Sequence, residues 1–520
     1  MKRLVIVEAS GKIDVIRAQL KSIGYPADVI ATVGHISHNP DSLRPISLDA
    51  NLRETAYATK PDRVNLLAKI CREASKADQV YLATDDDHEG DVIAYDLSVA
   101  LAEITDKLWR VRLRALSGSE LQHAFDEATQ GDFKTAAHNG ICRRIVDRAI
   151  GATFSMFSNP EKVPVGRVQN ALLATLATQP IQAGTYVISA KMADGLTYLA
   201  EVPIATRADL TGAEAIAAAL REKGVEEFES VVEEPVDGPV ASLWGYEEVV
   251  AQASLRLRIP LEQAADAFQE AYEKGRVTYP RVRKNGVTPD AIEVALALAR
   301  HNRCLFDGRQ VAVRVVGTNT GYAHEAPRPV DEEMQLGVSL SMLSASDAVA
   351  VMVARNIIEC GQSVSVKRMR VQIAERDVLF SYAAKPQRRN NWHAQEATVG
   401  FTPFGKDVAL LRFMAQYDLG RPSTIVSHVK TFLDRGLLHG FDSELTLTVR
   451  AKHWLTYGEQ CGLTADVSMK IEKMLQGTIS DPHKAAEVIL RQHGMLESVQ
   501  EKIFHDAKEE KPDRTSEFTY

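Results

Sequence analysis

Residues 79–104 read QVYLATDDDHEGDVIAYDLSVALAEI, an apolar run followed by an acidic turn and then a helical pattern. The apolar run has the length of a buried strand, and the pattern after the turn has the length of a helix. Two more apolar runs accompany it: RLVIVE at 3–8, followed by a helical pattern at 11–23, and WRVRLRAL at 109–116. Short apolar strands that alternate with helices predict an α/β domain with a parallel sheet, which we expect to span residues 1–133.

The remainder of the chain alternates between helical and β-type stretches. Residues 184–205 and 365–384 have similar β-type patterns although they lie far apart, so one β domain built from two passes of the chain accounts for both. The mostly helical segment between them then forms an insertion. The further parts that we expect are a helical domain from 134–182 and 401–506, a β domain from 183–247 and 361–400, a helical insertion from 248–360, and a disordered tail from 507–520.

The composition limits the possible classes of function. The 520 residues carry a formal net charge of -8 at pH 7, so any nucleic-acid contact must come from local clusters of Arg and Lys. The five cysteines include no C-x-x-C pair, which predicts reduced thiols and no zinc site. The first apolar run is too short for a signal peptide, and no run has the length of a membrane span. We therefore expect a cytoplasmic protein with no membrane partner.

Acidic side chains gather where two of the predicted strands end. Asp85, Asp87 and Glu89 follow one strand, and Glu8 ends another. In open parallel sheets, ligands collect outside the C-terminal ends of the strands. Four carboxylates near one point repel one another unless a cation lies among them, and oxygen ligands suit Mg²⁺. The alternative interpretation is that these acids only cap and solvate the start of a helix.

A tyrosine within GRVTYPRVRKN, residues 275–285, is a candidate nucleophile. Pro280 disfavours helical geometry at Tyr279 and favours an extended backbone, in which Tyr279 and Arg281 share one face. A phenol has a pKa of about 10 and is a weak nucleophile at neutral pH. A neighbouring guanidinium stabilises both the phenolate and a developing phosphate charge. A packed tyrosine in a surface turn is the alternative interpretation.

The stretch RRIVDR, residues 143–148, predicts a helix with two charged faces. Arg144 and Arg148 lie four residues apart and share one face, as do Arg143 and Asp147. The first face can grip phosphates, while the second forms a supporting ion pair. A solvated basic helix is the alternative interpretation.

Together these motifs resemble those of a known family. VEASGK at 7–12 and ATDDDHEGD at 83–91 resemble the toprim module, and TYPR at 278–281 resembles the active-site motif of type IA DNA topoisomerases. Other segments that resemble the family, in the family's order, are RRIVDR at 143–148, VGRVQN at 165–170, HEAPRP at 324–329 and GRPST at 420–424. The resemblance covers about four-fifths of the chain.

The resemblance implies a role for each matching residue. It implies that Tyr279 is the nucleophile, that Arg281 and Lys12 stabilise the phosphate, and that Glu8 manages the proton on the leaving oxygen. His324 is implied to contact the cleaved strand at the reacting centre. The implied ligands of Mg²⁺ are Asp85, Asp87 and Glu89, with Glu8 close by. The residues implied to contact single-stranded DNA are Arg144, Arg148, Arg167, Gln169, Arg328, Arg421 and Ser423.

The resemblance also implies a fold and an activity. The implied fold is a torus of toprim, helical and β-arch domains, with the tyrosine on a movable helical domain. The implied activity is that of an isomerase without ATP, which cleaves, passes and reseals DNA strands through a 5′-phosphotyrosyl bond and relaxes negative supercoils. The implied partner is single-stranded or negatively supercoiled DNA, and we expect a monomer. Decatenation is a second activity that stays open.

Several features depart from the family or favour other functions. The family usually has Arg at His88, often has Glu at Asp91 and tends to have an acidic residue at Arg283. GFTPFGKD, residues 400–407, resembles a phosphate-binding loop, but Asp407 replaces the required Ser or Thr, so we expect no ATP site. A toprim nuclease or primase would share the acidic cluster without needing Tyr279. A catalytically impaired homologue that binds single-stranded DNA would keep the arginines. A type II topoisomerase is disfavoured because the chain offers no ATPase region.

Overall fold

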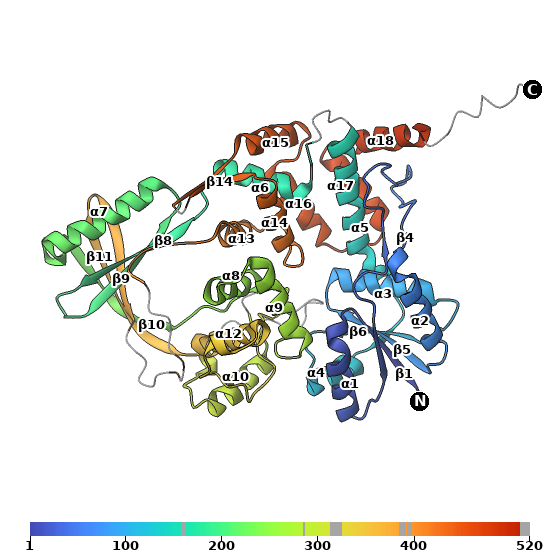
Figure 1. The fold of residues 1–520 in the computed structure, drawn as a ribbon, viewed down its shortest axis with the longest axis horizontal. Coiled ribbons are helices and arrows are strands. Elements are labelled where there is room, and N and C mark those ends of the chain that lie inside the picture. Colours follow the sequence, from blue (N-terminus) through green and yellow to red (C-terminus); the bar gives the residue numbers. More distant parts are fainter. Residues whose placement is uncertain are drawn as a thin grey trace, which may run out of the picture. The chain divides into compact units, whose positions relative to one another are not determined.

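The computed structural model describes residues 1–157, 163–283, 286–312, 325–383, 390, 392, 398–441 and 443–509. The chain forms two compact units: unit 1 comprises Met1–Thr175 and Val449–Tyr520, and unit 2 comprises Leu176–Thr448. Figure 1 follows the chain through both units. Unit 1 is therefore built from the two ends of the chain, and unit 2 from its middle.

Unit 1 contains a five-stranded sheet in the order β2-β1-β5-β6-β7. Its strands are β1 (Arg3–Val7), β2 (Asp28–Ala31), β5 (Gln79–Asp85), β6 (Leu108–Leu113) and β7 (Thr129–Gln130). The pairs β1–β2, β1–β5 and β5–β6 are parallel, and β6–β7 is antiparallel. The central strands β1 and β5 are buried along nearly their whole length, as expected for strands covered on both faces. The predicted parallel sheet is confirmed.

Helices cover this sheet and extend beyond it. The elements of the N-terminal part are η1 (Ser10–Lys12), α1 (Ile13–Ser22), β3 (Ser37–His38), β4 (Ala58–Thr59), η2 (Pro61–Arg63), α2 (Val64–Ala74), α3 (His88–Leu101), α4 (Gly118–Asp126), α5 (Phe133–Ala152), η3 (Thr153–Phe157) and α6 (Arg167–Thr178). The C-terminal part adds α15 (Val449–Gln460), α16 (Ala465–Leu475), α17 (Pro482–Gln492) and α18 (Leu496–Glu509). One core joins Leu4, Ile6 and Leu82 of the sheet to Ile93 and Leu97 of α3.

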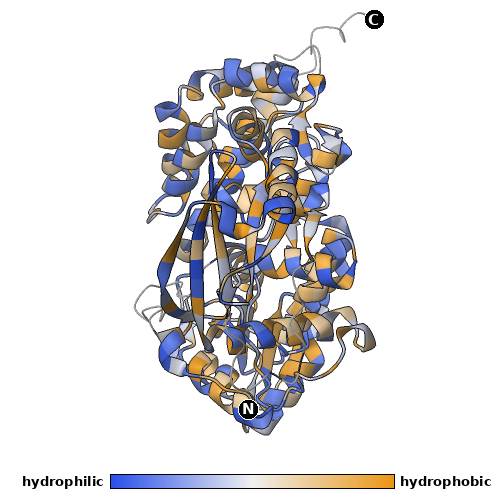
Figure 2. Ribbon diagram, turned by 90° about the vertical axis from the view of Figure 1, so that its left-hand side faces the viewer, coloured by the Kyte–Doolittle hydropathy of each residue, from blue (hydrophilic) through white to orange (hydrophobic). Residues whose placement is uncertain are grey.

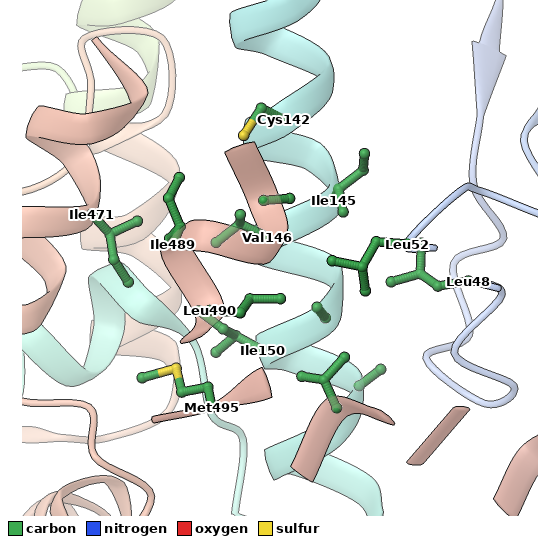
Figure 3. Close-up of a cluster of buried hydrophobic side chains, with 14 of the residues drawn as sticks. Leu48, Leu52, Cys142, Ile145, Val146, Ile150, Ile471, Ile489, Leu490 and Met495 are labelled. Atoms are coloured by element: carbon green, nitrogen blue, oxygen red, sulfur yellow. The ribbon is translucent and has the colours of Figure 1, made fainter. Parts of the chain in front are cut away.

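A second core of unit 1 surrounds α5. Figure 3 shows its side chains converging from α5, from the C-terminal helices and from the loop after β3. The labelled members are Leu48, Leu52, Cys142, Ile145, Val146, Ile150, Ile471, Ile489, Leu490 and Met495. The helix α5 is therefore buried from several sides.

Unit 2 contains a six-stranded sheet in the order β10-β11-β12-β9-β8-β13. Its strands are β8 (Gly184–Lys191), β9 (Thr197–Ile204), β10 (Ser230–Pro239), β11 (Ser363–Ile373), β12 (Arg376–Ala383) and β13 (Gly400–Pro403), and every pairing is antiparallel. The two β-rich stretches of the sequence therefore share one sheet. Figure 2 shows hydrophobic and hydrophilic residues alternating along these strands, and α7 (Arg207–Lys223) packs Ile216 and Leu220 against the apolar face.

The rest of unit 2 is mostly helical. Its elements are η4 (Val225–Glu227), α8 (Tyr246–Leu257), α9 (Leu261–Glu273), α10 (Pro289–His301), α11 (Gly308–Ala312), η5 (Leu340–Met342), α12 (Ala345–Cys360), α13 (Lys406–Gln416), α14 (Ile425–Asp434), β14 (Leu438–Phe441) and β15 (Glu444–Leu447). Helix α9 packs against α8, α12 and α14. The mixed α/β, α and β class expected from the sequence is thereby confirmed.

Two expectations concern parts of the chain at the limit of the structure. Residues 507–509 of the predicted disordered tail belong to α18, and residues 510–520 lie outside the described part. Among the described residues, no helix has both the length and the apolar character that crossing a membrane requires. The domain boundaries drawn from the sequence stay predictions.

Candidate active site

The acidic turn of unit 1 lies where β5 passes into α3. Strands β1 and β5 are parallel, with Val7 opposite Ala83, so Glu8 and Asp85 emerge at the same edge of the sheet. Asp87 is the N-cap of α3, and its Oδ1 accepts the amide N–H of Gly90 at 2.7 Å. A Cβ on Gly90 would approach the carbonyl oxygen of Asp85 to 2.2 Å, so only glycine fits there. The carboxylates therefore occupy the predicted edge, and Asp87 is also a helix cap, as the alternative interpretation proposed.

Asp85 forms a buried ion pair. The ammonium of Lys12, in η1, donates to Oδ1 of Asp85, and both side chains are inaccessible to solvent or nearly so. Lys12 was selected as a phosphate contact and Asp85 as a metal ligand. A buried charge needs a partner of opposite sign, and here each supplies it to the other.

Glu89 has a histidine partner that the sequence analysis missed. Nε2 of His35 lies 2.9 Å from Oε2 of Glu89. Burial acts to lower the pKa of His35, but the hydrogen bond and charge of Glu89, with the charges of Asp96 and Glu8, outweigh burial and raise the pKa above its ordinary value. A protonated imidazole is thus favoured beside Glu89. No local pattern marks His35, because it precedes β3 and reaches Glu89 only through the fold.

Two further aspartates at this turn have arginine partners on β6 or directly after it. Asp86 meets Arg112 and Arg114, and Asp91 meets Arg110 and Arg112, at distances of 2.7–3.2 Å. Burial lowers the pKa of Arg110, while the charge of Asp91 opposes that effect. Asp91, one of the departures from the family pattern, therefore has a structural partner in this chain. The sequence signal was the alternation of arginines in WRVRLR.

The carboxylates at this edge of the sheet are the type of ligand that a hard divalent cation prefers. Asp87 and Glu89 are partly exposed and offer oxygen atoms, and Mg²⁺ typically takes one or two carboxylates and keeps several waters. Within the described residues, the group of three ligand-type side chains that approach within 4.8 Å is instead His505, Asp506 and Glu509 on α18. Asp506 pairs there with Lys502, and Glu509 pairs with Arg44, so protein cations already balance that group.

The tyrosine segment of unit 2 pairs with a distant segment. Val277 forms an antiparallel bridge with Pro329, and the amide of Thr278 donates to the carbonyl of Arg328 at 3.0 Å. In return, the amide of Arg328 donates to Oγ1 of Thr278 at 3.1 Å. The motifs TYPR and HEAPRP, selected separately from the sequence, therefore lie side by side.

Tyr279 is buried at the end of this pairing. Its side chain is 3% exposed, and its ring packs edge-on against Tyr272, with ring centroids 5.6 Å apart. The extended geometry expected through Arg281 does not continue, because the amide of Val282 donates to the carbonyl of Pro280 and closes a tight turn. Arg281 is partly buried near Tyr246, where its charge opposes the effect of burial, which raises the pKa of Tyr246 to about 12.

Two arginines flank Tyr279 with ion pairs inside unit 2. Nε of Arg328 donates to Glu325 at 2.7 Å, and the side chain of Arg328 is buried. Nε of Arg283 donates to Glu247 at 2.6 Å, and another of its nitrogens donates to Asp418. Arg283, a departure from the family pattern, is therefore part of an ion-pair network. His324 lies outside the described residues.

The GRPST segment begins a helix. Gly420 has a φ of 73°, a left-handed conformation that glycine tolerates best. The carbonyl of Arg421 accepts the amides of Thr424 and Ile425 in the turn before α14. Arg421 and Ser423 are partly exposed at this helix start, where amide groups favour a negatively charged ligand.

The arginines of α5 are engaged within unit 1. Arg144 donates to both oxygens of Glu54 at 2.7 Å and stacks over the ring of Tyr57. Arg148 is buried, and its guanidinium donates to the carbonyls of Ile46, Pro40 and Ser42 at 2.7–2.9 Å. Both arginines of this face thus contact protein groups in the structure, and their binding of phosphate stays a prediction.

The supporting ion pair also differs from the one expected. Arg143 pairs with Glu472 of α16 at 2.7 Å, whereas Asp147 pairs with Arg167 at 2.9 Å. Burial acts to raise the pKa of Asp147, but the charges of Arg167 and Arg143 outweigh burial and lower it. Gln169, in the first turn of α6, is also buried. Helix-face spacing alone did not reveal these partners, because they come from other helices: Glu472 lies 329 residues from Arg143, and Arg167 lies 20 residues from Asp147.

Comparisons with known proteins place this arrangement in a class and then in a family. The Toprim domain family matches residues 3–116, which contain the parallel sheet and the acidic turn. The family described as DNA topoisomerase matches residues 132–400, just over half of the chain. The chain therefore belongs to the type IA DNA topoisomerase family.

Individual relatives agree with this assignment. DNA topoisomerase 1 of Campylobacter jejuni is 28% identical over 189 residues, covering 36% of this chain and 26% of the relative. DNA topoisomerase 1 of Aquifex aeolicus is 26% identical over 291 residues, covering 54% and 52%. The matches thus span about half or less of these relatives' lengths. The structure of full-length topoisomerase I from Thermotoga maritima has a TM-score of 0.65 at 19% identity, covers 96% of this chain and 90% of that one, and shows the shared fold.

Proposed function

We propose that this chain cleaves and reseals single DNA strands through a 5′-phosphotyrosyl bond on Tyr279, without ATP and with Mg²⁺, and so relaxes negatively supercoiled DNA. The observation that carries the proposal is the antiparallel pairing of residues 276–278 with 328–330. This pairing holds Tyr279 next to a segment that contains a buried arginine, in a chain of the type IA family. A positive charge close to a phenol favours its ionisation and stabilises phosphate charge.

The proposed chemistry assigns a role to each residue. Oη of Tyr279 attacks the phosphorus in line, an oxygen–phosphorus bond forms, and the bond to the 3′ oxygen breaks. The phenol proton passes to water, and the carboxyl group of Glu8 supplies a proton to the departing 3′ oxygen. Arg281 and Lys12 stabilise the charge on the phosphate, and His324 contacts the cleaved strand. The reverse reaction reseals the strand, and the phosphotyrosyl ester conserves the energy of the broken linkage.

The proposed metal ligands are Asp87 and Glu89, with Asp85 joining them when Lys12 turns to phosphate and Glu8 nearby. When bound, Mg²⁺ would supply positive charge that favours resealing. The carboxylates themselves orient the site through their hydrogen bonds to Gly90 and His35. The identity of the metal and the absence of zinc and ATP are parts of this proposal.

The proposed DNA contacts are those with access to solvent or with partners that phosphate can replace. Arg421 and Ser423 at the start of α14 fit this description, and so does Arg144, whose side chain is 24% exposed. Arg167, Gln169 and Arg328 are buried and would contact DNA only after a rearrangement. We propose a structural role for Arg148, because its hydrogen bonds to backbone carbonyls brace the loop after β3.

The domain scheme completes the proposal. We propose a toprim domain at 1–133, a helical DNA-binding domain at 134–182 and 401–506, a β-arch at 183–247 and 361–400, and a tyrosine domain at 248–360. Passage of a second strand requires the tyrosine domain to move away from the toprim domain while Tyr279 holds the cleaved end. We further propose that the protein acts as a monomer in the cytoplasm.

Trapping of a covalent adduct tests the tyrosine. The full chain is incubated with single-stranded oligonucleotides labelled at either end and then denatured. A 5′-phosphotyrosyl bond retains the label on the 3′ end with the protein and releases the label on the 5′ end. Tyr279→Phe should form no adduct, whereas the control Tyr272→Phe, which keeps the packed ring, should form it. An adduct with Tyr279→Phe would refute the tyrosine mechanism.

Chelation separates the proposed activity from the alternatives. Relaxation of negatively supercoiled plasmid should stop when divalent cations are chelated and resume when Mg²⁺ is restored. Cleavage without any adduct would instead indicate a toprim nuclease. Binding of single-stranded DNA without cleavage would indicate an impaired homologue.

A further inference from the structure

Three arginines, two on β6 and one directly after it, form a row beside the acidic turn of unit 1. Arg110, Arg112 and Arg114 alternate along the strand and its end, so their side chains point to one face of the sheet. Strand β6 pairs in parallel with β5, and Leu113 lies opposite Asp85. The row therefore lies beside β5, the strand that leads into the acidic turn. It ends at the level of Asp85, where the turn begins.

The row forms ion pairs with Asp86 in the turn and with Asp91 in the helix that follows. Asp86 lies between Asp85 and Asp87, and its fully buried carboxylate accepts Arg112 at 3.2 Å and Arg114 at 2.7 Å. Asp91, in the first turn of α3, is also fully buried and accepts the same Arg112 at 2.8 Å. One guanidinium thus ties the start of the turn to the helix that follows it.

The backbone of the turn is held by the same row. Arg110 donates to the carbonyl of Thr84 at 3.1 Å and to the carbonyl of Asp85 at 3.0 Å. It also donates to Asp91. The guanidinium groups of the row thus hold the backbone of Thr84 and Asp85 and the carboxylates of Asp86 and Asp91. A buried carboxylate that lost its guanidinium would be unstable in place.

We propose that the ion pair of Asp86 with Arg112 positions Asp85, Asp87 and Glu89 for a divalent cation. Asp86 and Arg112 are positioning residues, because they act through the neighbouring carboxylates and do not themselves bind the cation. Groups that orient metal ligands typically influence metal affinity by about 10- to 100-fold. The inference rests on the metal-dependent part of the proposed function and concerns residues to which that function gave no role.

Direct binding of Mn²⁺ to the full chain, without DNA, tests the proposal. Mn²⁺ is titrated by electron paramagnetic resonance, and Asp86→Asn is compared with the unaltered chain. The variant keeps the size of the side chain and removes its charge. Its Mn²⁺ affinity should fall by about 10-fold or more. The Mg²⁺ concentration needed for half-maximal plasmid relaxation should rise in parallel, while the rate at saturating Mg²⁺ stays within about 2-fold.

Two further variants keep the test decisive. Arg114→Gln removes one partner of Asp86 at a partly exposed position, so it should fold and weaken Mn²⁺ binding less than Asp86→Asn does. Asp62→Asn is the matched control, because Asp62 is an exposed aspartate of unit 1 that pairs with Arg63. Its Mn²⁺ affinity should not change.

Three outcomes would overturn the proposal: unaltered Mn²⁺ affinity in a folded Asp86→Asn variant, a fall in maximal rate at an unaltered Mg²⁺ requirement, or no Mn²⁺ binding by the unaltered chain. The proposed function has a separate test. If the unaltered chain forms no adduct while Asp86→Asn binds Mn²⁺ more weakly than the unaltered chain does, the tyrosine mechanism is refuted and the positioning role is supported. If the unaltered chain forms the adduct and Asp86→Asn has unaltered Mn²⁺ affinity, the tyrosine mechanism is supported and the positioning role is refuted.

Discussion

The acidic turn of unit 1 and the tyrosine segment of unit 2 hold their functional groups in different ways. In the acidic turn, the carboxylates proposed to act are themselves the anchors, since Asp85 pairs with Lys12 and Glu89 with His35. In the tyrosine segment, backbone hydrogen bonds with Arg328 provide the anchor, and the phenol of Tyr279 is a separate group. Function and stability are therefore coupled in the first region and more nearly separate in the second.

The buried pair of Lys12 and Asp85 should give the largest effect. Lys12→Met leaves the carboxylate of Asp85 buried without its cation, so the free energy of unfolding should fall by about 3–5 kcal/mol. Urea titration of the full chain in chelator measures the change. Lys76→Met, which removes a surface partner of Glu73, should change it by at most about 1 kcal/mol. Equal effects from both variants would contradict the coupling of function and stability in the turn.

Arg148 tests whether a second buried charge of unit 1 serves structure alone. Arg148→Met removes hydrogen bonds to four carbonyls, so stability should fall by about 2–3 kcal/mol. The salt dependence of binding to single-stranded DNA should not change, because no phosphate contact is lost. Arg421→Ala should show the opposite result, with little loss of stability and a salt slope smaller by about 0.7. A reduced slope for Arg148→Met would restore its role in DNA binding.

Thr278→Val tests the anchor of the tyrosine segment. The substitution keeps the shape of the side chain but removes the oxygen that accepts the amide of Arg328, so stability should fall by about 1–2 kcal/mol. Adduct formation at Tyr279 should decrease at the same time if this pairing aligns the phenol. Trapping and urea titration on one preparation measure both effects. Undiminished adduct formation would show that the pairing is not needed for alignment.

His35 should give the smallest effect and a pH dependence. Its pKa is raised in the folded state above the ordinary value of 6.5, so its contribution to stability is complete below pH 6.5. The contribution is lost as the pH rises through the folded-state pKa. The difference in melting temperature between the unaltered chain and His35→Gln should therefore shrink as the pH rises above 6.5. A difference that is constant or grows would contradict a protonated His35 beside Glu89.

Part of the candidate site could be predicted because its logic is local. Parallel strands end at one edge, so the positions of Glu8 and Asp85 followed from two apolar runs and the residues after them. The glycine after Glu89 was also part of the sequence motif. The structure shows why glycine is needed there: the carbonyl oxygen of Asp85 occupies the space that a side chain on Gly90 would need. The parallel sheet and the shared antiparallel sheet followed from the same kind of pattern.

Other parts could not be predicted because their causes are non-local. Helix spacing correctly placed Arg144 and Arg148 on one face of α5. It could not predict that Glu54 and the carbonyls after β3 would cover that face. The expected pair of Arg143 with Asp147 does not form. Glu472 of α16 instead pairs with both Arg143 and Arg167. The row of arginines on β6 was visible in the sequence, but its aspartate partners were not.

The sequence by itself determined which chemical groups the chain possesses and the short spacings among them: the acidic turn, TYPR and the family to which they belong. Only the tertiary structure decided which charges neutralise one another, which arginines stay accessible, and that TYPR pairs with a segment about 50 residues further along. The physical reason is that residue type and local backbone preference act over a few neighbours, whereas burial and ion pairing depend on segments that meet only in the folded chain.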